Sequence, residues 1–144
     1  VIYIGRDSYE KGIDILKNIE LKINGKIIYC TNLSWEKTMT ILKSSTLLIV
    51  PSRMESIPQV IKEAFYLKIP VIATNVGGIS EIIENKKNGI LIPPENPNKM
   101  IEAINNLLIN PLLIDKLTKN AFDFINENFT WDVLIEKYLE LYEK

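Results

Sequence analysis

Histidine is absent from the 144 residues of this chain, and cysteine occurs only once. Without histidine the chain lacks the commonest general base and metal ligand, so Ser-His and Cys-His catalysis are excluded within it. A single cysteine cannot form an intrachain disulfide, which favours a reducing, cytoplasmic setting. Cys30 lies in the apolar run 26–30, where we expect a small buried hydrophobe and not a nucleophile.

Long apolar runs and an excess of one charge are also lacking. No stretch approaches the roughly 18 to 20 apolar residues that cross a membrane, and no signal peptide is recognisable. With 17 basic and 18 acidic residues the net charge is -1, without a basic stripe, so nucleic acid is not an expected partner. The first residue is Val1 and not methionine, which we interpret as a sign that other sequence precedes it.

What is present is a globular composition, 47% hydrophobic and 24% charged, at a length that suits one domain. Five short runs rich in Ile, Val and Leu are apolar on both faces, which is typical of buried parallel strands. Their alternation with segments of helical period predicts βαβ units. We therefore predict a Rossmann-like three-layer α/β/α domain with a helical C-terminal tail and a parallel sheet over 1–4, 26–30, 47–50, 70–73 and 89–92.

Capping residues mark the helices. Ser34 and Thr130 are candidate N-caps, and Asn96-Pro97 and Asn110-Pro111 are cap and first-turn pairs. The helices that they predict cover about 35–43, 97–109, 111–127 and 131–142. The apolar stripe of the last helix is expected to pack on this domain or on a further one. A role of that stripe at the inner face of a membrane is the weaker alternative.

Ligands of open parallel sheets bind beyond the carboxyl ends of the strands, so the residues after each run are the candidates for a site. Arg6 follows the first run, and Lys11 lies where the next helix is expected to begin. Two cations beside a helix N-terminus form a site suited to a diphosphate. Two solvated surface cations are the alternative.

Glu55 and Glu63 are spaced as Glu-x7-Glu. Glu55 lies on the loop after the third run, Pro58 suits the first turn of the following helix, and Glu63 falls on the flank of its buried face. A carboxylate accepts two hydroxyl donors at once, as a vicinal diol such as a ribose presents them. The two glutamates are therefore candidates to hold hydroxyls at opposite ends of one ligand, and two solvated glutamates are the alternative.

Gly77 and Gly78 follow the fourth run and precede a helix. Paired glycines there allow a backbone to approach a ligand closely, although Gly-Gly is also found in plain turns.

The order and spacing of these motifs resemble the donor domain of retaining GT-B glycosyltransferases, the glycosyl transferase group 1 family. The resemblance covers nearly the whole chain. It is strongest over 51–55, 63–64, 69–74, 77–78, 81–83, 88–89 and Pro94. It implies that residues 1–144 are the C-terminal, nucleotide-sugar-binding half of a hexosyltransferase whose acceptor-binding N-terminal domain is absent from the chain.

The resemblance also assigns roles to residues. Arg6 and Lys11 would grip the donor diphosphate, and Glu63 would hold the ribose hydroxyls. Glu55, the catalytic-site candidate, would contact hydroxyls of the transferred sugar, with a role as covalent nucleophile as a minor alternative. The remaining contacts with the donor would come from Ser56, Ile57, Pro58, Gly77 and Gly78 near the sugar and phosphate, and from Thr31, Asn32 and Leu33 near the base.

The resemblance implies a UDP- or GDP-linked sugar as donor substrate and no further cofactor. No divalent metal is expected, because the two cations and the helix ends neutralise the leaving diphosphate. The acceptor would be a sugar or lipid of polysaccharide or glycolipid synthesis, bound by the other half. The chain alone is therefore expected to be inactive, and the full protein could associate with a membrane peripherally.

Two departures from the family pattern stand out. Ser56, Ile57 and Pro58 replace a frequent stretch of Gly, an aromatic or leucine, and Gly, and Pro58 has no amide hydrogen to donate. The segment from Gly12 to Lys26 is too short for the strand, loop and helix usual there, so the sheet is predicted to be one strand smaller. These departures keep open the alternative function, a non-catalytic nucleotide-binding or interaction module of the same fold.

Overall fold

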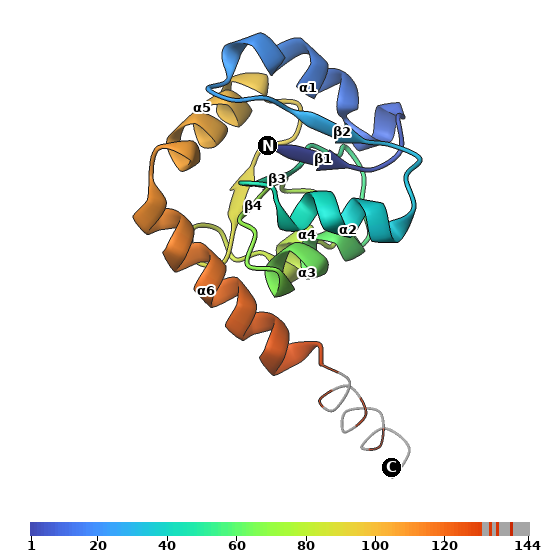
Figure 1. The fold of residues 1–144 in the computed structure, drawn as a ribbon, viewed down its shortest axis with the longest axis vertical. Coiled ribbons are helices and arrows are strands. Elements are labelled where there is room, and N and C mark those ends of the chain that lie inside the picture. The colour runs from blue at the N-terminus through green and yellow to red at the C-terminus, as the bar shows by residue number, and fades with distance from the viewer. Residues whose placement is uncertain (131–132, 134, 136–138, 140–144) are drawn as a thin grey trace.

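The computed structural model describes residues 1–130 together with Val133, Ile135 and Leu139. Its centre is a five-stranded sheet in the order β2-β1-β3-β4-β5, in which every neighbouring pair is parallel (Figure 1). The strands are β1 (Ile2–Ile4), β2 (Ile28–Cys30), β3 (Leu48–Val50), β4 (Val71–Thr74) and β5 (Ile90–Ile92). Each strand coincides with a predicted apolar run to within one residue at its carboxyl end, so the predicted parallel sheet is confirmed.

The helices surround this sheet. They are α1 (Ile13–Ile19), α2 (Trp35–Lys43), α3 (Gln59–Tyr66), α4 (Ile79–Ile82), α5 (Pro97–Leu108) and α6 (Pro111–Asn128), with short 3-10 turns η1 (Tyr9–Lys11) and η2 (Glu20–Lys22). Three of them begin at the predicted caps. The side chains of Ser34, Asn96 and Asn110 each accept a hydrogen bond from a backbone N–H of the first turn.

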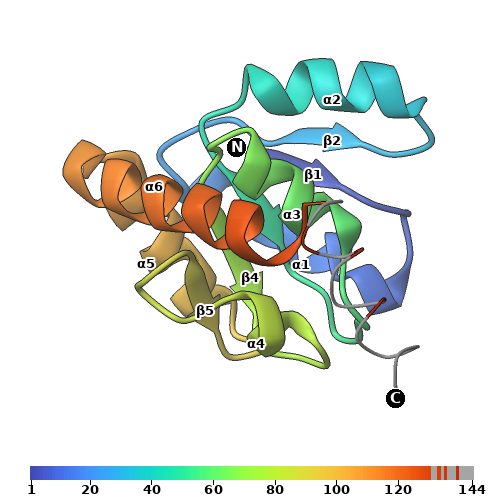
Figure 2. The ribbon, with the colours of Figure 1, turned by 90° about the horizontal axis from the view of Figure 1, so that it is seen from below.

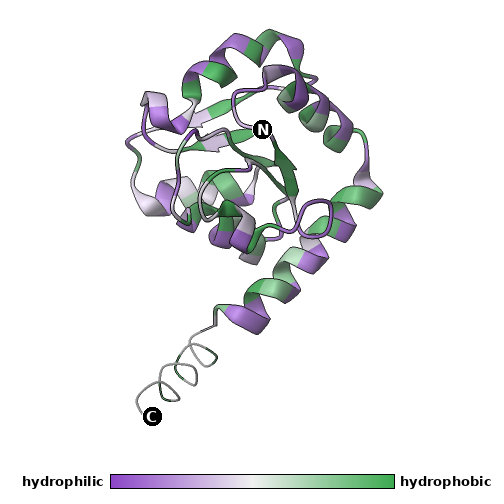
Figure 3. Cartoon of the chain, turned by 180° about the vertical axis from the view of Figure 1, so that it is seen from behind, coloured by the Kyte–Doolittle hydropathy of each residue, from purple (hydrophilic) through white to green (hydrophobic). Residues whose placement is uncertain are grey.

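Alternate residues of a strand point to opposite faces of the sheet, and each face has its own core. Leu48 and Val50 pack with residues of α2, α3 and α4, whereas Ile49 between them packs with residues of α1 and α5. Figures 1 and 2 show these two helical layers on either side of the strands. In Figure 3 the strands are mainly hydrophobic, interrupted by a few paler bands, and the helices alternate between hydrophobic and hydrophilic residues. The three-layer α/β/α architecture is therefore confirmed.

The helix α6 crosses from one layer to the other. Leu117 near its middle belongs to the core that contains α1 and α5, whereas Ala121 and Ile125 belong to the core that contains α3. In its second half α6 lies beside α3 (Figure 2). The predicted last helix over 131–142, with its proposed membrane role, lies outside the described residues except for three isolated positions. Among the described residues, no helix combines the length and the apolar character that crossing a membrane requires.

The segment from Gly12 to Lys26 holds α1 and η2 and no strand, as expected from its length. Asn105 of α5 holds the end of this segment. Its side-chain oxygen accepts a hydrogen bond from the backbone N–H of Asn24 at 2.6 Å. Cys30 is buried, and this burial raises the pKa of its thiol. The interpretation of Cys30 as a core residue is confirmed.

Candidate functional site

The chain leaves β1 and β3 toward opposite faces of the sheet, although the two strands are neighbours. Residues 5–12 lead from β1 to α1 in one layer, and residues 51–58 lead from β3 to α3 in the other. In a sheet of this order the divergence is the topological switch point, where the loops leave a crevice for a ligand. We call residues 5–12 and 51–58 the switch-point loops.

Lys11 and Glu55 join the two switch-point loops. The Nζ atom of Lys11 lies 2.5 Å from Oε1 of Glu55, and the hydroxyl of Ser52 donates to the same oxygen at 2.9 Å. The Glu55 side chain is only 8% exposed and that of Lys11 24%, so solvent screens this pair less than it would a surface pair. The structure thus brings into direct contact two residues that the sequence assigned to different parts of one ligand.

Glycines allow the loops to approach each other this closely. Gly12 and Gly77 both have positive φ, +68° and +51°. A Cβ atom on Gly12 would collide with the carbonyl oxygen of Pro51, and one on Gly77 would collide with that of Glu55. Gly78 likewise lies against the carbonyl of Ser56. The Gly77–Gly78 pair therefore holds the loop after β4 against the backbone of the Glu55 loop, and its contact with a ligand stays a prediction.

Arg53 is a central residue of the site to which the sequence assigned no role. Its guanidinium donates to both carboxylate oxygens of Asp14, at 2.8 and 2.9 Å, and to Glu95 at 2.9 Å. It also lies over the ring of Tyr9, 3.8 Å from the ring centroid. Hydrogen bonding from Arg53 is the main cause that lowers the pKa of Asp14. Arg53 thereby ties the loops after β1, β3 and β5 together, and its partners became identifiable only with the strand order.

The first switch-point loop is fixed at its start by Tyr3. The phenol of Tyr3 donates to the backbone carbonyl of Arg6 at 2.6 Å, and burial raises the pKa of Tyr3 to about 12, which keeps this donor protonated. The side chain of Arg6 is exposed and forms no ion pair with another described residue. Lys11 ends η1, and α1 begins two residues after it at Ile13, later than the sequence suggested.

Glu63 lies in the second turn of α3 and is half-buried. Its Oε1 accepts a hydrogen bond from Nε1 of Trp35 at 2.9 Å. Trp35 is the first residue of α2, so this bond links Glu63 to the loop after β2, which contains Thr31, Asn32 and Leu33. Asn32 has φ +57°, a left-handed conformation that asparagine tolerates. The only sequence signal for Trp35 was an aromatic residue two positions after the predicted base-side loop Thr31–Leu33.

The helix α3 begins at Gln59, and Pro58 occupies the N-cap position with an extended ψ of 122°. The expectation that Pro58 lies in the first turn was therefore wrong by one residue, because its backbone does not enter the helical region. Ser56 is exposed, and Ile57 and Pro58 are half-buried. In the first turn of α3 the N–H of Ile61 donates to the carbonyl of Pro58 at 3.2 Å, and the N–H groups of Gln59 and Val60 precede any helical partner.

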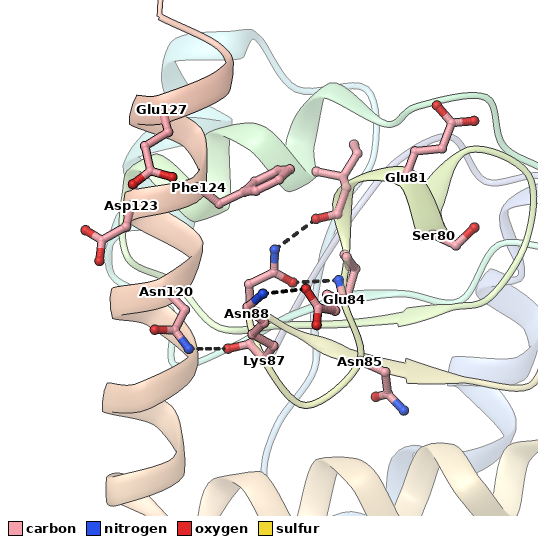
Figure 4. A pocket seen from close by; sticks show the side chains of 12 residues that line it. Ser80, Glu81, Glu84, Asn85, Lys87, Asn88, Asn120, Asp123, Phe124 and Glu127 are labelled. Atoms are coloured by element: carbon pink, nitrogen blue, oxygen red, sulfur yellow. Dashed lines mark hydrogen bonds and ion pairs between the residues drawn. The ribbon is translucent and has the colours of Figure 1, made fainter.

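A cavity of about 610 Å³ lies elsewhere, between α4, the turn 83–89 and α6 (Figure 4). None of the predicted site residues lines it. The side chain of Asn88 donates to the carbonyl of Ile82 and accepts from the N–H of Glu84, and Asn120 of α6 donates to the carbonyl of Lys87. Carboxylates dominate the remaining lining, from Glu81, Glu84, Asp123 and Glu127.

These features define a Rossmann-like α/β domain with oppositely charged side chains gathered at its switch point. Residues 17–124 match the family model of the glycosyl transferases group 1, and the chain belongs to this family. Glu55, Glu63, Gly77 and Gly78 lie within the matched region, whereas Arg6 and Lys11 precede it.

An uncharacterised glycosyltransferase of Methanocaldococcus jannaschii is 29% identical over 167 residues, covering 99% of this chain and 47% of the relative. That alignment is longer than the chain, so the relative has residues at positions where this chain has none. The alignments of this chain with its first three relatives cover 47%, 44% and 39% of the relatives' length, less than half in each case.

Two solved GT-B glycosyltransferase structures show the same fold. Sucrose-phosphate synthase of Thermosynechococcus elongatus superposes with a TM-score of 0.87 at 22% identity, covering 99% of this chain and 44% of that one. HepE of Anabaena, solved in complex with UDP-glucose, superposes with a TM-score of 0.83 at 17% identity. The superposition covers 99% of this chain and 48% of HepE. The prediction of a glycosyl transferase group 1 domain is confirmed.

Proposed function

We propose that this chain is the donor-binding, C-terminal half of a retaining glycosyltransferase, and that it binds a nucleoside diphosphate sugar at the switch point. The observation that carries the proposal is the contact between Lys11 and Glu55, which gathers a cation and a hydroxyl acceptor where the loops after β1 and β3 diverge. Membership of the glycosyl transferases group 1 and a fold shared with a protein that binds UDP-glucose support it.

The diphosphate would lie between Arg6, Lys11 and the N-terminal amides of α3. Arg6 is exposed and forms no ion pair with another described residue, so its guanidinium can bind a phosphate oxygen without breaking an internal contact. Lys11 would exchange part of its contact with Glu55 for a phosphate oxygen. Each charged hydrogen bond of this kind contributes about 1.5 to 3 kcal/mol. Positive charge at the leaving diphosphate is the means by which this half would assist the transfer.

The two glutamates would bind the two ends of the donor. Glu55, partly freed from Lys11, would accept from hydroxyls of the transferred hexose, with the backbone of Ser56–Pro58 and of Gly77–Gly78 alongside. Glu63 would accept from the ribose, and the loop Thr31–Leu33 would lie near a uracil or guanine base. Neither role requires a divalent metal or a further cofactor.

The acceptor, a sugar or lipid, would bind to a second domain, since the chain spans less than half of its first relatives. The chain alone would then bind the donor without transferring the sugar. A cytoplasmic location, with peripheral membrane contact of the full protein, belongs to this proposal as an expectation from the sequence.

A second candidate function is a non-catalytic nucleotide-binding module, and Pro58 is the observation that favours it. Proline at the N-cap of α3 removes one amide donor from the backbone that would face the sugar and phosphate. Sugar transfer by the full protein to an acceptor would exclude this alternative, and tight nucleotide binding without transfer would support it.

Calorimetric titration of the 144-residue chain with UDP and with GDP tests the proposal. We expect one of the two nucleotides to bind, and Arg6→Ala or Lys11→Ala to weaken that binding about tenfold or more, equivalent to about 1.4 kcal/mol. Lys119→Ala, which removes an exposed ammonium from α6, is the matched control and should leave the affinity unchanged. Equal affinities of the wild-type chain and both site variants would reject the assigned phosphate site.

A further inference from the structure

The side chains of Trp35 and Glu63 connect the first turn of α2 to the second turn of α3 through one hydrogen bond of 2.9 Å. We propose that Trp35 is a positioning residue, which fixes the Glu63 carboxylate for recognition of the ribose diol. This inference rests on the proposed function, in which Glu63 accepts from the ribose hydroxyls. It adds Trp35, a residue outside the Glu-x7-Glu pattern, to the recognition of the donor. By holding Glu63, Trp35 would favour a ribose over a 2′-deoxyribose.

Both ends of the hydrogen bond are held by packed backbone. The carbonyl of Ser34 accepts from the backbone N–H and the hydroxyl of Thr38, at 3.0 and 2.9 Å, which fixes the start of α2 where Trp35 lies. The helix α3 is anchored by Ile61, Ala64 and Phe65, each 0% exposed. The separation of the indole and the carboxylate is therefore set by the two helices, as a preorganised site requires.

The chemistry of the pair suits a diol. An indole N–H donates and cannot accept, so Trp35 does not compete with the carboxylate for hydroxyl protons. It engages Oε1 of Glu63, and the hydrogen bonds among the described residues leave Oε2 without a donor. A glutamate side chain without such a partner would lose rotamer freedom on binding the ligand, which costs free energy. Trp35 removes part of that cost before the nucleotide arrives.

The position of the pair also suits a nucleoside. Trp35 directly follows the loop 31–34 at the carboxyl end of β2, and its side chain is 64% exposed. With Glu63 it lines a groove of about 340 Å³ between α2 and α3, which is also lined by Met39, Thr40, Lys43, Tyr66 and Leu67.

The test compares UDP with 2′-deoxy-UDP by calorimetry on the 144-residue chain, or GDP with its 2′-deoxy form if GDP is the nucleotide that binds. For the wild-type chain we expect the ribonucleotide to bind about tenfold more tightly, the effect of one hydrogen bond to a charged group. Trp35→Phe keeps an aromatic ring and removes the N–H, and should reduce that ratio to about threefold or less. Its affinity for the 2′-deoxy nucleotide should stay unchanged. Trp35→Gln, which restores an N–H donor, should recover part of the ratio.

A double-mutant cycle separates positioning from packing. Glu63→Gln should lower the ratio by itself, and adding Trp35→Phe to it should cause no further loss, because Trp35 acts through Glu63. Tyr66→Phe, which removes a polar hydrogen from another aromatic residue of the same groove, is the control and should keep the wild-type ratio. Circular dichroism of each variant confirms that it is folded.

The outcomes distinguish the inference from the proposed function. A wild-type ratio retained in Trp35→Phe would overturn the positioning role and leave the proposed function intact. Binding of UDP or GDP without preference for the ribose would also overturn the positioning role, by removing the role of Glu63, while the phosphate site would stand. Failure of the wild-type chain to bind either nucleotide would overturn the proposed function, and the inference with it.

Discussion

Two polar regions of the molecule differ in what their side chains connect. At the switch point, Lys11 contacts Glu55 and Arg53 contacts Asp14 and Glu95, so side chains join loops that follow three different strands. In the cavity between α4 and α6 (Figure 4), asparagines bond mainly to the backbone of the turn 83–89. The first region gathers opposite charges where strand ends diverge, whereas the second stabilises one turn against one helix. The cavity between α4 and α6 is thus the weaker candidate for a binding site.

Electrostatics sharpen this comparison. The cavity is lined by four carboxylates and a single cation, Lys87, which is already paired with Glu84 at 2.7 Å. A diphosphate would be repelled there. At the switch point Lys11 is likewise paired, with Glu55, but the exposed guanidinium of Arg6 has no ion pair with another described residue. Together with the N-terminal end of α3, this guanidinium favours an anion. The local charge therefore favours anion binding at the switch point over the cavity, a difference that the net charge of -1 does not reveal.

The largest effect is expected at Gly77. Gly77→Ala should lower the free energy of unfolding by about 3 kcal/mol, because a methyl group would collide with the carbonyl of Glu55 at a positive φ. Gly25→Ala is the control, since its Cβ would meet only Leu108 at 3.4 Å, and we expect a change within about 0.5 kcal/mol. Urea unfolding measures both. Equal effects would show that the loops after β3 and β4 are not held together as described.

At Asn88 we expect loss of stability without loss of binding. Asn88→Ala should cost about 2 kcal/mol, because it leaves the carbonyl of Ile82 and the N–H of Glu84 without their partner. Its affinity for UDP or GDP should equal that of the wild-type chain. Asn98→Ala, on the exposed side of α5, is the control for stability. If the folded Asn88→Ala variant bound the nucleotide more weakly, the cavity between α4 and α6 would have a role in binding, contrary to our comparison of the two regions.

Glu55 should affect recognition of the sugar more than that of the nucleotide. Glu55→Gln should reduce the advantage of a nucleotide sugar over its free nucleotide about fivefold, the effect of about 1 kcal/mol. UDP-glucose against UDP is the pair to measure by calorimetry, with GDP-mannose against GDP as the second pair. Lys119→Ala again serves as the control. An unchanged ratio in both pairs would remove Glu55 from the sugar site.

The Arg53–Asp14 pair gives the smallest effect, visible as a pH dependence. Arg53 lowers the pKa of Asp14 from its ordinary 3.8, so the pair stabilises the fold fully above that value. This contribution is lost as the pH falls through the folded-state pKa. Because the Asp14 side chain is 47% exposed, we expect less than about 1 kcal/mol. Urea unfolding of the wild-type chain and Asp14→Asn should differ at pH 7 and converge near pH 2; a difference that grows with acid would reverse the assignment.

The strands and several helix starts were predictable because they depend on local sequence. Val-, Ile- and Leu-rich runs such as 47–50 gave the strands, and Asn96 and Asn110 gave the starts of α5 and α6 through capping. Pro58 was misplaced by one residue, since proline is compatible both with a first helical turn and with the N-cap before it.

The contacts of the site were not predictable, because they depend on the strand order and on side-chain geometry. The sequence named Lys11, Glu55 and Glu63, but the contact of Lys11 with Glu55 requires β1 and β3 to be neighbours. The bond from Trp35 to Glu63 requires α2 and α3 to share a layer. No role was assigned to Arg53 from the sequence, since its partners come from three separate segments.

The most direct test maps nucleotide binding onto the backbone amides. In ¹H–¹⁵N NMR spectra of the 144-residue chain, UDP or GDP should shift the amide signals of residues 5–12, 31–35, 55–63 and 77–78. The signals of residues 84–88 and 120–127, around the acidic cavity, should remain in place. Shifts confined to the cavity residues, with the switch-point loops unaffected, would contradict the account.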